Sequence, residues 1–228
     1  MLLTLLLTAQ LAAEAPSATP AGLGPVPVEA VRVFLLRHGQ AFTNLDPAPN
    51  LPREQLDRLT ELGHAQSRRA GEALRPIRIE RVLTSPAGRA RETAQDLKTL
   101  LGWPVDVESR LRPLDVGKAP EGFEDPWDWR IAEWEAGRDP TPDGGESMQA
   151  MGQRVLDLAL SLARKPGRSL VCVAHSEVIA AFVGAVDGTA AAKRWPPRVS
   201  NGSITVVDVE AGGRARVRLV GYVAAPPR

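Results

Sequence analysis

The sequence predicts an α/β fold: a three-layer sandwich in which helices cover both faces of a central, mostly parallel sheet. Apolar runs with strand character alternate along the chain with segments of helical periodicity, and this alternation is typical of parallel sheets. The chain of 228 residues is 43% hydrophobic and 24% charged, an ordinary globular composition that allows one sizeable core. No internal repeat is visible. We therefore expect one domain with an N-terminal tail.

The first half of the domain is expected to hold three strands and two helices. In chain order these are strand 31–36, helix 60–74, strand 79–84, helix 87–102 and a short edge strand within 103–111. Thr60 stands at the start of the first helix, where a hydroxyl can cap the free backbone N–H groups. The second helix should end near Gly102, because glycine commonly follows the last helical turn.

The second half is expected to begin with a long insertion and to end in a hairpin. Residues 112–145 are dense in Pro, Gly, Asp and Trp, which predicts irregular structure with one short helix at 127–134. The remaining expected elements are helix 146–164, strand 169–174, helix 178–186 and the hairpin strands 203–209 and 216–223. Gly212 and Gly213 supply the turn of that hairpin.

The N-terminal residues are expected to lie outside the domain, which we place at 30–225. Residues 1–15 form an apolar stretch with the length of a signal-peptide core, although no Lys or Arg precedes it. Residues 16–29 are rich in Pro, Ala and Gly and indicate a linker. We expect a periplasmic or secreted protein, with a cytoplasmic one as the alternative. The apolar stretch is too short to span a bilayer, so no stable membrane insertion is expected after processing.

The charge and the metal-binding residue types exclude several functions. The formal net charge of +1 gives no large field of one sign, so neither nucleic acid nor an anionic membrane is an expected partner. The chain contains one cysteine, Cys172, which stands in an apolar run and is expected to be a buried thiol. With one Cys and three His, a zinc site of the Cys/His type is not expected.

Polar side chains follow three of the expected strands at the point where each strand ends. Arg37 and His38 follow the first strand, Ser85 and then Arg89 follow the second, and His175 follows the buried strand of the second half. Ligands of parallel sheets bind beyond the carboxyl ends of the strands. If these strands are neighbours, two arginines and two histidines meet at one edge of the sheet.

Two arginines and two histidines beside a helix start are typical of a phosphoryl-transfer site. Guanidinium groups give planar, permanently charged contacts to phosphoryl oxygens, and helix N-termini add free N–H groups. A neutral imidazole held through one nitrogen can attack phosphorus with the other. Gly39 lets the backbone come close enough to orient the ring of His38, and the second imidazole can stabilise charge on the transferring group.

The segment "LLRHGQAFTN" resembles the Arg-His-Gly segment of the histidine phosphatase superfamily, which includes the cofactor-dependent phosphoglycerate mutases. The resemblance continues in the family's order through 59–66, 84–94, 144–147, 171–179 and 201–209. It implies a phosphoglycerate mutase-like fold and chemistry without a metal or an organic cofactor. It also implies that His38 is the nucleophile, Arg37 and Arg89 are phosphate clamps, His175 is the second active-site histidine, and Asn44 contacts phosphate.

One departure from the family pattern leaves the proton donor open. Many members carry a glutamate in a segment similar to "RLRPLDVGKAPEG", at the position where this chain has Pro113. Asp115 lies two residues further on and is the first candidate. Glu177, two residues after His175, and Glu121 are alternatives, and a site without a dedicated acid is a fourth option. A donor needs a raised pKa and must reach the leaving oxygen.

We expect a phosphomonoesterase that acts through phosphohistidine on a phosphorylated small molecule or protein. A phosphoglycerate mutase-type transfer is the alternative, but acidic residues outnumber basic ones in the insertion at 112–145, which disfavours a highly phosphorylated ligand near it. A second alternative is an idle domain that binds phosphorylated ligands, which the missing glutamate allows. A phosphatase of phosphohistidine proteins is a third, since a leaving nitrogen can be protonated beforehand.

Overall fold

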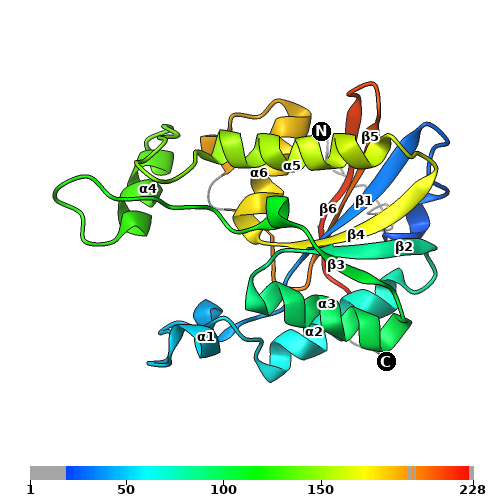
Figure 1. Cartoon of the computed structure of the whole chain (residues 1–228), viewed down its shortest axis with the longest axis horizontal. Coiled ribbons are helices and arrows are strands. Elements are labelled where there is room, and N and C mark those ends of the chain that lie inside the picture. Colours follow the sequence, from blue (N-terminus) through cyan, green and yellow to red (C-terminus); the bar gives the residue numbers. More distant parts are fainter. Residues whose placement is uncertain (1–18, 195–196, 198, 226–228) are drawn as a thin grey trace, which may run out of the picture.

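A computed structural model describes residues 19–194, 197 and 199–225, and in it six strands form one sheet with the order β3-β2-β4-β1-β5-β6 (Figure 1). The strands are β1 (Ala30–Arg37), β2 (Ile79–Thr84), β3 (Val105–Val107), β4 (Arg168–Ala174), β5 (Ile204–Glu210) and β6 (Ala215–Tyr222). Strands β3, β2, β4 and β1 are parallel, whereas β5 is antiparallel to β1 and β6 to β5. The expected mostly parallel central sheet is confirmed.

Helices cover both faces of this sheet, so the predicted three layers are also confirmed (Figure 1). The α-helices are α1 (Arg53–Leu56), α2 (Glu61–Leu74), α3 (Gly88–Leu101), α4 (Pro126–Glu135), α5 (Met148–Ala163) and α6 (Ser176–Asp187). Helices α2 and α3 pack on one face, and α5 and α6 pack on the other. Helices α1 and α4 lie beyond the end of the sheet to which the parallel strands point (Figure 1).

Strand β1 is buried on both faces because it lies inside the sheet. Val33 and Leu35 belong to the apolar cluster under α5 and α6, while Phe34 and Leu36 belong to the cluster under α2 and α3. Each of these four side chains is at most 2% exposed. This burial on both faces explains why the strand is an uninterrupted apolar run until Arg37.

The predicted helix ends agree with the structure in the first half of the chain. Thr60 caps α2, because its side-chain oxygen accepts a hydrogen bond from the Gly63 N–H at 3.1 Å. Helix α3 ends at Leu101, and the next residue, Gly102, has a φ of 72° in the left-handed region that favours glycine. The four-residue helix α1 was not expected, and it ends directly before Asp57.

Two helices of the second half begin at other residues than expected. Helix α5 begins at Met148 instead of 146, because Ser147 caps it by accepting a hydrogen bond from the Ala150 N–H at 3.0 Å. Helix α6 begins at Ser176 instead of 178. His175 therefore occupies the N-cap position of α6, directly between β4 and the helix.

The insertion at 112–145 contains α4, as predicted, and a buried arginine fixes this helix to the rest of the domain. The Arg130 guanidinium donates a hydrogen bond to the carbonyl oxygen of Glu146 at 2.9 Å. It also lies over the ring of Trp134, with 4.8 Å between its central carbon and the ring centroid. Trp127 packs edge-on against Trp134. These tryptophans are therefore part of the packing of the insertion.

The described part of the N-terminal segment, 19–29, contacts the sheet. Arg32 donates a hydrogen bond to the Gly24 carbonyl oxygen at 2.7 Å, and its guanidinium also pairs with Asp208. The expected signal peptide, residues 1–15, lies outside the described residues, as does the beginning of the expected linker at 16–29. Among the helices that the structure describes, none has both the length and the apolar character needed to cross a bilayer.

Candidate active site

The carboxyl ends of β2, β4 and β1 lie side by side, and the residue after each strand is polar. The hydrogen-bond ladder continues beyond the strand ends: the His38 N–H donates to the Ala174 carbonyl oxygen and the Ser85 N–H to the Val173 carbonyl oxygen, each at 3.0 Å. His175 follows Ala174 on the strand between them. The rings of His38 and His175 have centroids 5.1 Å apart. The structure thus brings these residues together at one edge, as predicted.

The backbone holds the ring of His38 by one nitrogen and leaves the other for chemistry. Nδ1 lies 2.7 Å from the Gly39 carbonyl oxygen, and Nε2 lies 3.1 Å from Nε of Arg89. A carbonyl and a guanidinium fix the tautomer, because the first can only accept a hydrogen bond and the second can only donate. The proton is therefore on Nδ1, and Nε2 carries the lone pair that a nucleophile needs.

Gly39 is required at this point because the backbone passes against α2. A Cβ atom at position 39 would lie 2.2 Å from the Gly63 carbonyl oxygen, closer than any real contact. The N–H of Gly39 donates to the hydroxyl of Thr93 on α3 at 3.0 Å. The glycine thus lets its own carbonyl reach Nδ1 of His38 while the chain is fixed between α2 and α3.

His175 is held in a complementary way. Its Nδ1 lies 3.1 Å from Nη2 of Arg89 and accepts a hydrogen bond from it, since arginine can only donate. Its Nε2 lies 2.8 Å from the Ser85 hydroxyl and donates to it. The imidazole is only 1% exposed. Ser85, expected simply as a residue of the strand end, therefore orients the second histidine.

Arg89 connects the two imidazoles. It is the second residue of α3, where the start of the helix points toward the sheet edge. Its Nε and Nη2 groups face His38 and His175, and its Nη1 forms an ion pair with Asp57. The edge formed by Nε and Nη2 is the one with which arginine binds two oxygens of a phosphate.

Burial and the nearby cations keep both imidazoles neutral. Burial, followed by the positive charges of Arg89 and Arg37, lowers the pKa of His38 to about 3, although the hydrogen bond to the Gly39 carbonyl opposes this change. Burial, followed by the influence of His38 and the arginines, also puts the pKa of His175 well below 6.5. A neutral His38 has its lone pair available at physiological pH.

Arg37 is the second cation of the site and is only partly satisfied by the protein. Its Nη1 donates to the Val199 carbonyl oxygen at 2.5 Å, and its buried Nε has no hydrogen-bond partner among the described residues. Burial lowers the pKa of Arg37, the charge of Glu177 raises it and that of Arg89 lowers it. A buried N–H without a partner beside a second guanidinium favours an anionic ligand.

Asn44 lies beside the same strand end, and Asn201, in the loop before β5, fixes it. Its side-chain oxygen accepts hydrogen bonds from the Ala41 N–H at 3.0 Å and from Nδ2 of Asn201 at 3.2 Å. Asn201 also donates to the His38 carbonyl oxygen at 3.1 Å. With its oxygen engaged in this way, Asn44 can turn its amide N–H groups outward, as a phosphate contact requires.

The three candidate proton donors differ in their surroundings. Asp115 is exposed, and its carboxylate accepts a long hydrogen bond from the Gly117 N–H at 3.4 Å. Glu121 is exposed on the insertion. Glu177 is half-buried in the first turn of α6, accepts a hydrogen bond from the Ser176 hydroxyl and acts electrostatically on Arg37. Of the three, Glu177 is the candidate whose charge acts on a cation of the site, Arg37.

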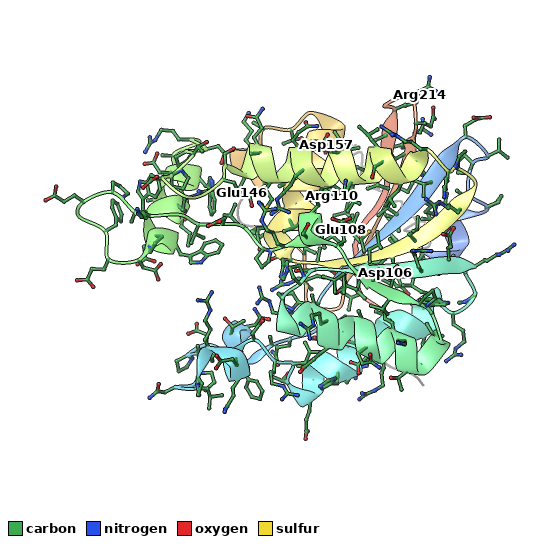
Figure 2. All side chains as sticks on the ribbon, in the orientation of Figure 1. Asp106, Glu108, Arg110, Glu146, Asp157 and Arg214 are labelled. Carbon is green, nitrogen blue, oxygen red and sulfur yellow. The ribbon has the colours of Figure 1, made fainter. Side chains whose placement is uncertain are left out.

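An ion pair fixes the loop at Pro113, and Figure 2 labels its acidic partner, Glu146. Glu146, before α5, accepts two hydrogen bonds from Arg154, which lies two turns along that helix. Arg154 also donates to the carbonyl oxygens of Arg110, Arg112 and Pro113. Both side chains of the pair are 12% exposed. Pro113, where the family resemblance implies a glutamate, therefore has a fixed backbone but no acidic side chain.

Among the described residues, no group of three or more His, Cys, Asp or Glu side chains is arranged to hold a metal ion. Charge at the site comes instead from the guanidinium groups of Arg37 and Arg89. That the chemistry needs no metal stays a prediction.

The chain belongs to the histidine phosphatase superfamily. The profile of branch 1 of this superfamily matches residues 33–221, which include every strand end described above. The resemblance inferred from the short segments is thereby confirmed.

Particular relatives include both mutase-like and phosphatase proteins. The probable phosphoglycerate mutase GpmB of Erwinia tasmaniensis is 32% identical over 186 residues, which cover 78% of this chain and 85% of the relative. The structure of Bacillus stearothermophilus YhfR is 26% identical with a TM-score of 0.70 and covers 85% of this chain and 98% of its own. The structure of the mycobacterial glucosyl-3-phosphoglycerate phosphatase is 28% identical with a TM-score of 0.64, and the match covers 84% of this chain and 99% of the phosphatase.

The lowered pKa values of the two imidazoles predict that the protein loses stability in mild acid. The unfolded chain takes up protons at both histidines as the pH falls through 6.5, whereas folded His38 stays neutral down to about 3. The free energy of unfolding should therefore fall below pH 6.5 by up to about 1.4 kcal/mol per pH unit for each histidine. Urea denaturation across this range measures the slope. His38→Gln should remove about half of it, and an unchanged slope in that variant would contradict the assignment.

Proposed function

We propose that this protein is a phosphomonoesterase that forms a phosphohistidine at Nε2 of His38. The observation that carries the proposal is the state of that nitrogen. Nε2 is unprotonated, because the ring proton is on Nδ1 and is donated to the Gly39 carbonyl oxygen, and Nε2 faces the edge of Arg89 that can bind phosphate. This combination supplies a nucleophile and a clamp for the group that it attacks.

In the first step the ester phosphate binds between the two guanidinium groups. Arg89 transfers its Nε and Nη2 hydrogen bonds from the imidazoles to two phosphoryl oxygens, and Arg37 neutralises the remaining charge. Nε2 of His38 then attacks phosphorus, the N–P bond forms, and the P–O bond to the alcohol breaks. The leaving oxygen takes a proton from an acid. The positive charge that develops on the ring is stabilised by the Gly39 carbonyl at Nδ1.

In the second step water cleaves the phosphoramidate. The oxygen of water attacks phosphorus, the N–P bond breaks, and its electron pair returns to Nε2. The proton of the water goes to the conjugate base of the acid, so that both products leave with the site restored. His175 lies close to the transferring group, because its ring centroid is 5.1 Å from that of His38. The negative charge of a bound phosphate favours protonation of its Nδ1, which can then donate a hydrogen bond to a phosphoryl oxygen.

We propose hydrolysis rather than phosphoglycerate mutase activity, although a relative carries a mutase name. A mutase must keep a bisphosphorylated intermediate bound while that intermediate reorients in the site. The insertion that contains α4 lies beyond the same sheet end as the site (Figure 1), and Glu121, Glu124 and Asp128 on it are exposed. Such a surface repels a second phosphate. The neighbour named as a glucosyl-3-phosphoglycerate phosphatase supports the same choice.

Among the three acids we propose Glu177 as the proton donor, in preference to Asp115 and Glu121. Its position in the first turn of α6 places it two residues from His175, and its charge acts on Arg37, which the phosphate must contact. A donor must reach the leaving oxygen, and of the three acids Glu177 is the one whose charge acts on a cation that holds the phosphate.

The proposal also covers the metal requirement of the reaction and the location of the protein. The site works without a metal, because the two arginines supply the positive charge that a metal would otherwise bring. Residues 1–15 direct export, so that the substrate is one that the enzyme meets in the periplasm or outside the cell, with a cytoplasmic substrate as the alternative.

The purified protein should hydrolyse p-nitrophenyl phosphate, and an excess of EDTA should leave the rate unchanged. His38→Ala should lower kcat at least about 10³-fold, because the nucleophile is lost while the clamps remain. Release of p-nitrophenol measures both. A parallel assay should detect no conversion of 2- to 3-phosphoglycerate in the presence of a bisphosphate primer.

Three results would contradict this proposal. They are full activity of His38→Ala, a strict requirement for added metal, and mutase turnover that exceeds hydrolysis. A panel of phosphorylated metabolites, tested with the wild type and with His38→Ala, then identifies the substrate class.

The donor is tested by comparing alkyl with aryl esters. An aryl oxide leaves without a proton, whereas an alkoxide does not. Glu177→Gln should therefore lower kcat for an alkyl phosphate by about 10²-fold more than for p-nitrophenyl phosphate. Asp115→Asn and Glu121→Gln should change both substrates alike. A selective loss of alkyl turnover in Asp115→Asn instead would make Asp115 the donor.

A further inference from the structure

The guanidinium of Arg89 contacts two imidazoles and the carboxylate of Asp57, and Asp57 is the negatively charged partner. Its Oδ1 accepts a hydrogen bond from Nη1 of Arg89 at 2.5 Å. The other donors of the guanidinium, Nε and Nη2, point at the two neutral imidazoles at 3.1 Å each. The carboxylate thus binds the outer side of the group and leaves the opposite edge for the site.

The carboxylate of Asp57 is itself fixed, by the backbone of the helix that carries Arg89. Its Oδ2 accepts a hydrogen bond from the Gly88 N–H, at the start of α3, at 2.6 Å. The two chains come so close that a Cβ atom at position 88 would lie 2.8 Å from the Asp57 carbonyl oxygen and 2.9 Å from Oδ2. One carboxylate therefore binds both the backbone and the side chain at the start of α3.

The charges explain why Arg89 needs such a partner. Arg89 lies near a second cation, and its charge lowers the pKa of Arg37. Without a bound anion the two guanidinium groups repel each other, and the weak acceptors on the imidazoles do not neutralise either of them. A carboxylate on the outer side of Arg89 holds the group in place before the phosphate arrives.

We propose that Asp57 is a positioning residue, which aims the Nε and Nη2 edge of Arg89 at the phosphoryl group. This inference rests on the proposed function. The side chains of the pair are 18% and 31% exposed, so the ion pair adds little to global stability and its loss should appear mainly in phosphate binding and turnover.

The chain offers a matched control in the next two residues of the same loop. Arg58 and Leu59 are attached to α3 by Glu92, whose two oxygens accept hydrogen bonds from Arg58 Nε and from the Leu59 N–H at 2.8 Å each. Glu92 thus joins the same loop to the same helix as Asp57 does. Its recorded contacts include none of the arginines or histidines of the site.

The test is a double-mutant cycle with two readouts. Asp57→Asn and Glu92→Gln are each made in the wild type and in Arg89→Ala. Calorimetry measures the dissociation constant of inorganic phosphate, and p-nitrophenyl phosphate gives kcat and KM. Asp57→Asn should weaken phosphate binding about tenfold and lower kcat/KM about 10- to 100-fold, and it should have no further effect once Arg89 is absent. Glu92→Gln should change either quantity less than about threefold.

The outcomes separate this inference from the proposed function. Equal effects of Asp57→Asn with and without Arg89, or an effect of Glu92→Gln as large as that of Asp57→Asn, would show that Asp57 merely anchors the loop and would overturn the inference. Phosphate binding that follows the expected cycle in a protein without turnover would support the inference and refute the phosphatase. A wild type that binds no phosphate would overturn both.

Discussion

Strands β1 and β4 pair in parallel with Arg37 opposite Ala174, so the next residue on each strand, His38 and His175, leaves the sheet at the same edge. A shift of this register by one residue would turn one of the rings to the other face of the sheet. Tight apolar packing on both faces of β1 prevents such a shift, because Phe34 and Leu36 fill one layer and Val33 and Leu35 fill the other. The site therefore depends on the core.

The electrostatics of the site follow from that edge. Two imidazoles that are almost completely buried stay neutral, and two guanidinium groups next to them carry the charge. Arg89 donates hydrogen bonds to a nitrogen of each imidazole, so the lone pair of Nε2 on His38 is engaged. In the proposed mechanism, a phosphate that accepts these hydrogen bonds frees this lone pair at the moment when the phosphorus atom that it attacks is bound.

Local sequence patterns predicted most of the fold and the central residues of the site. Apolar strands followed by polar residues placed His38, His175 and Arg89 at one edge, because the direction of parallel strands decides where their ends meet. Asp57 escaped this reasoning, since its partner lies 32 residues further along the chain and no periodicity links them. The contact between Glu146 and Arg154 also depends on how loops are arranged in space. The same holds for the choice of proton donor, which is needed because position 113 is a proline. Such contacts are set by tertiary packing.

In the proposed mechanism a phosphoryl group is bonded to Nε2 of His38 during turnover, and trapping this intermediate tests the mechanism most directly. Trypsin cleavage after Arg37 and Arg53 gives a peptide of residues 38–53 in which His38 is the sole histidine. After brief incubation with p-nitrophenyl phosphate and an alkaline quench, mass spectrometry should find one phosphoryl group on this peptide, stable in alkali and lost in acid. A phosphoryl group on another peptide, or turnover with this peptide never modified, would contradict the mechanism.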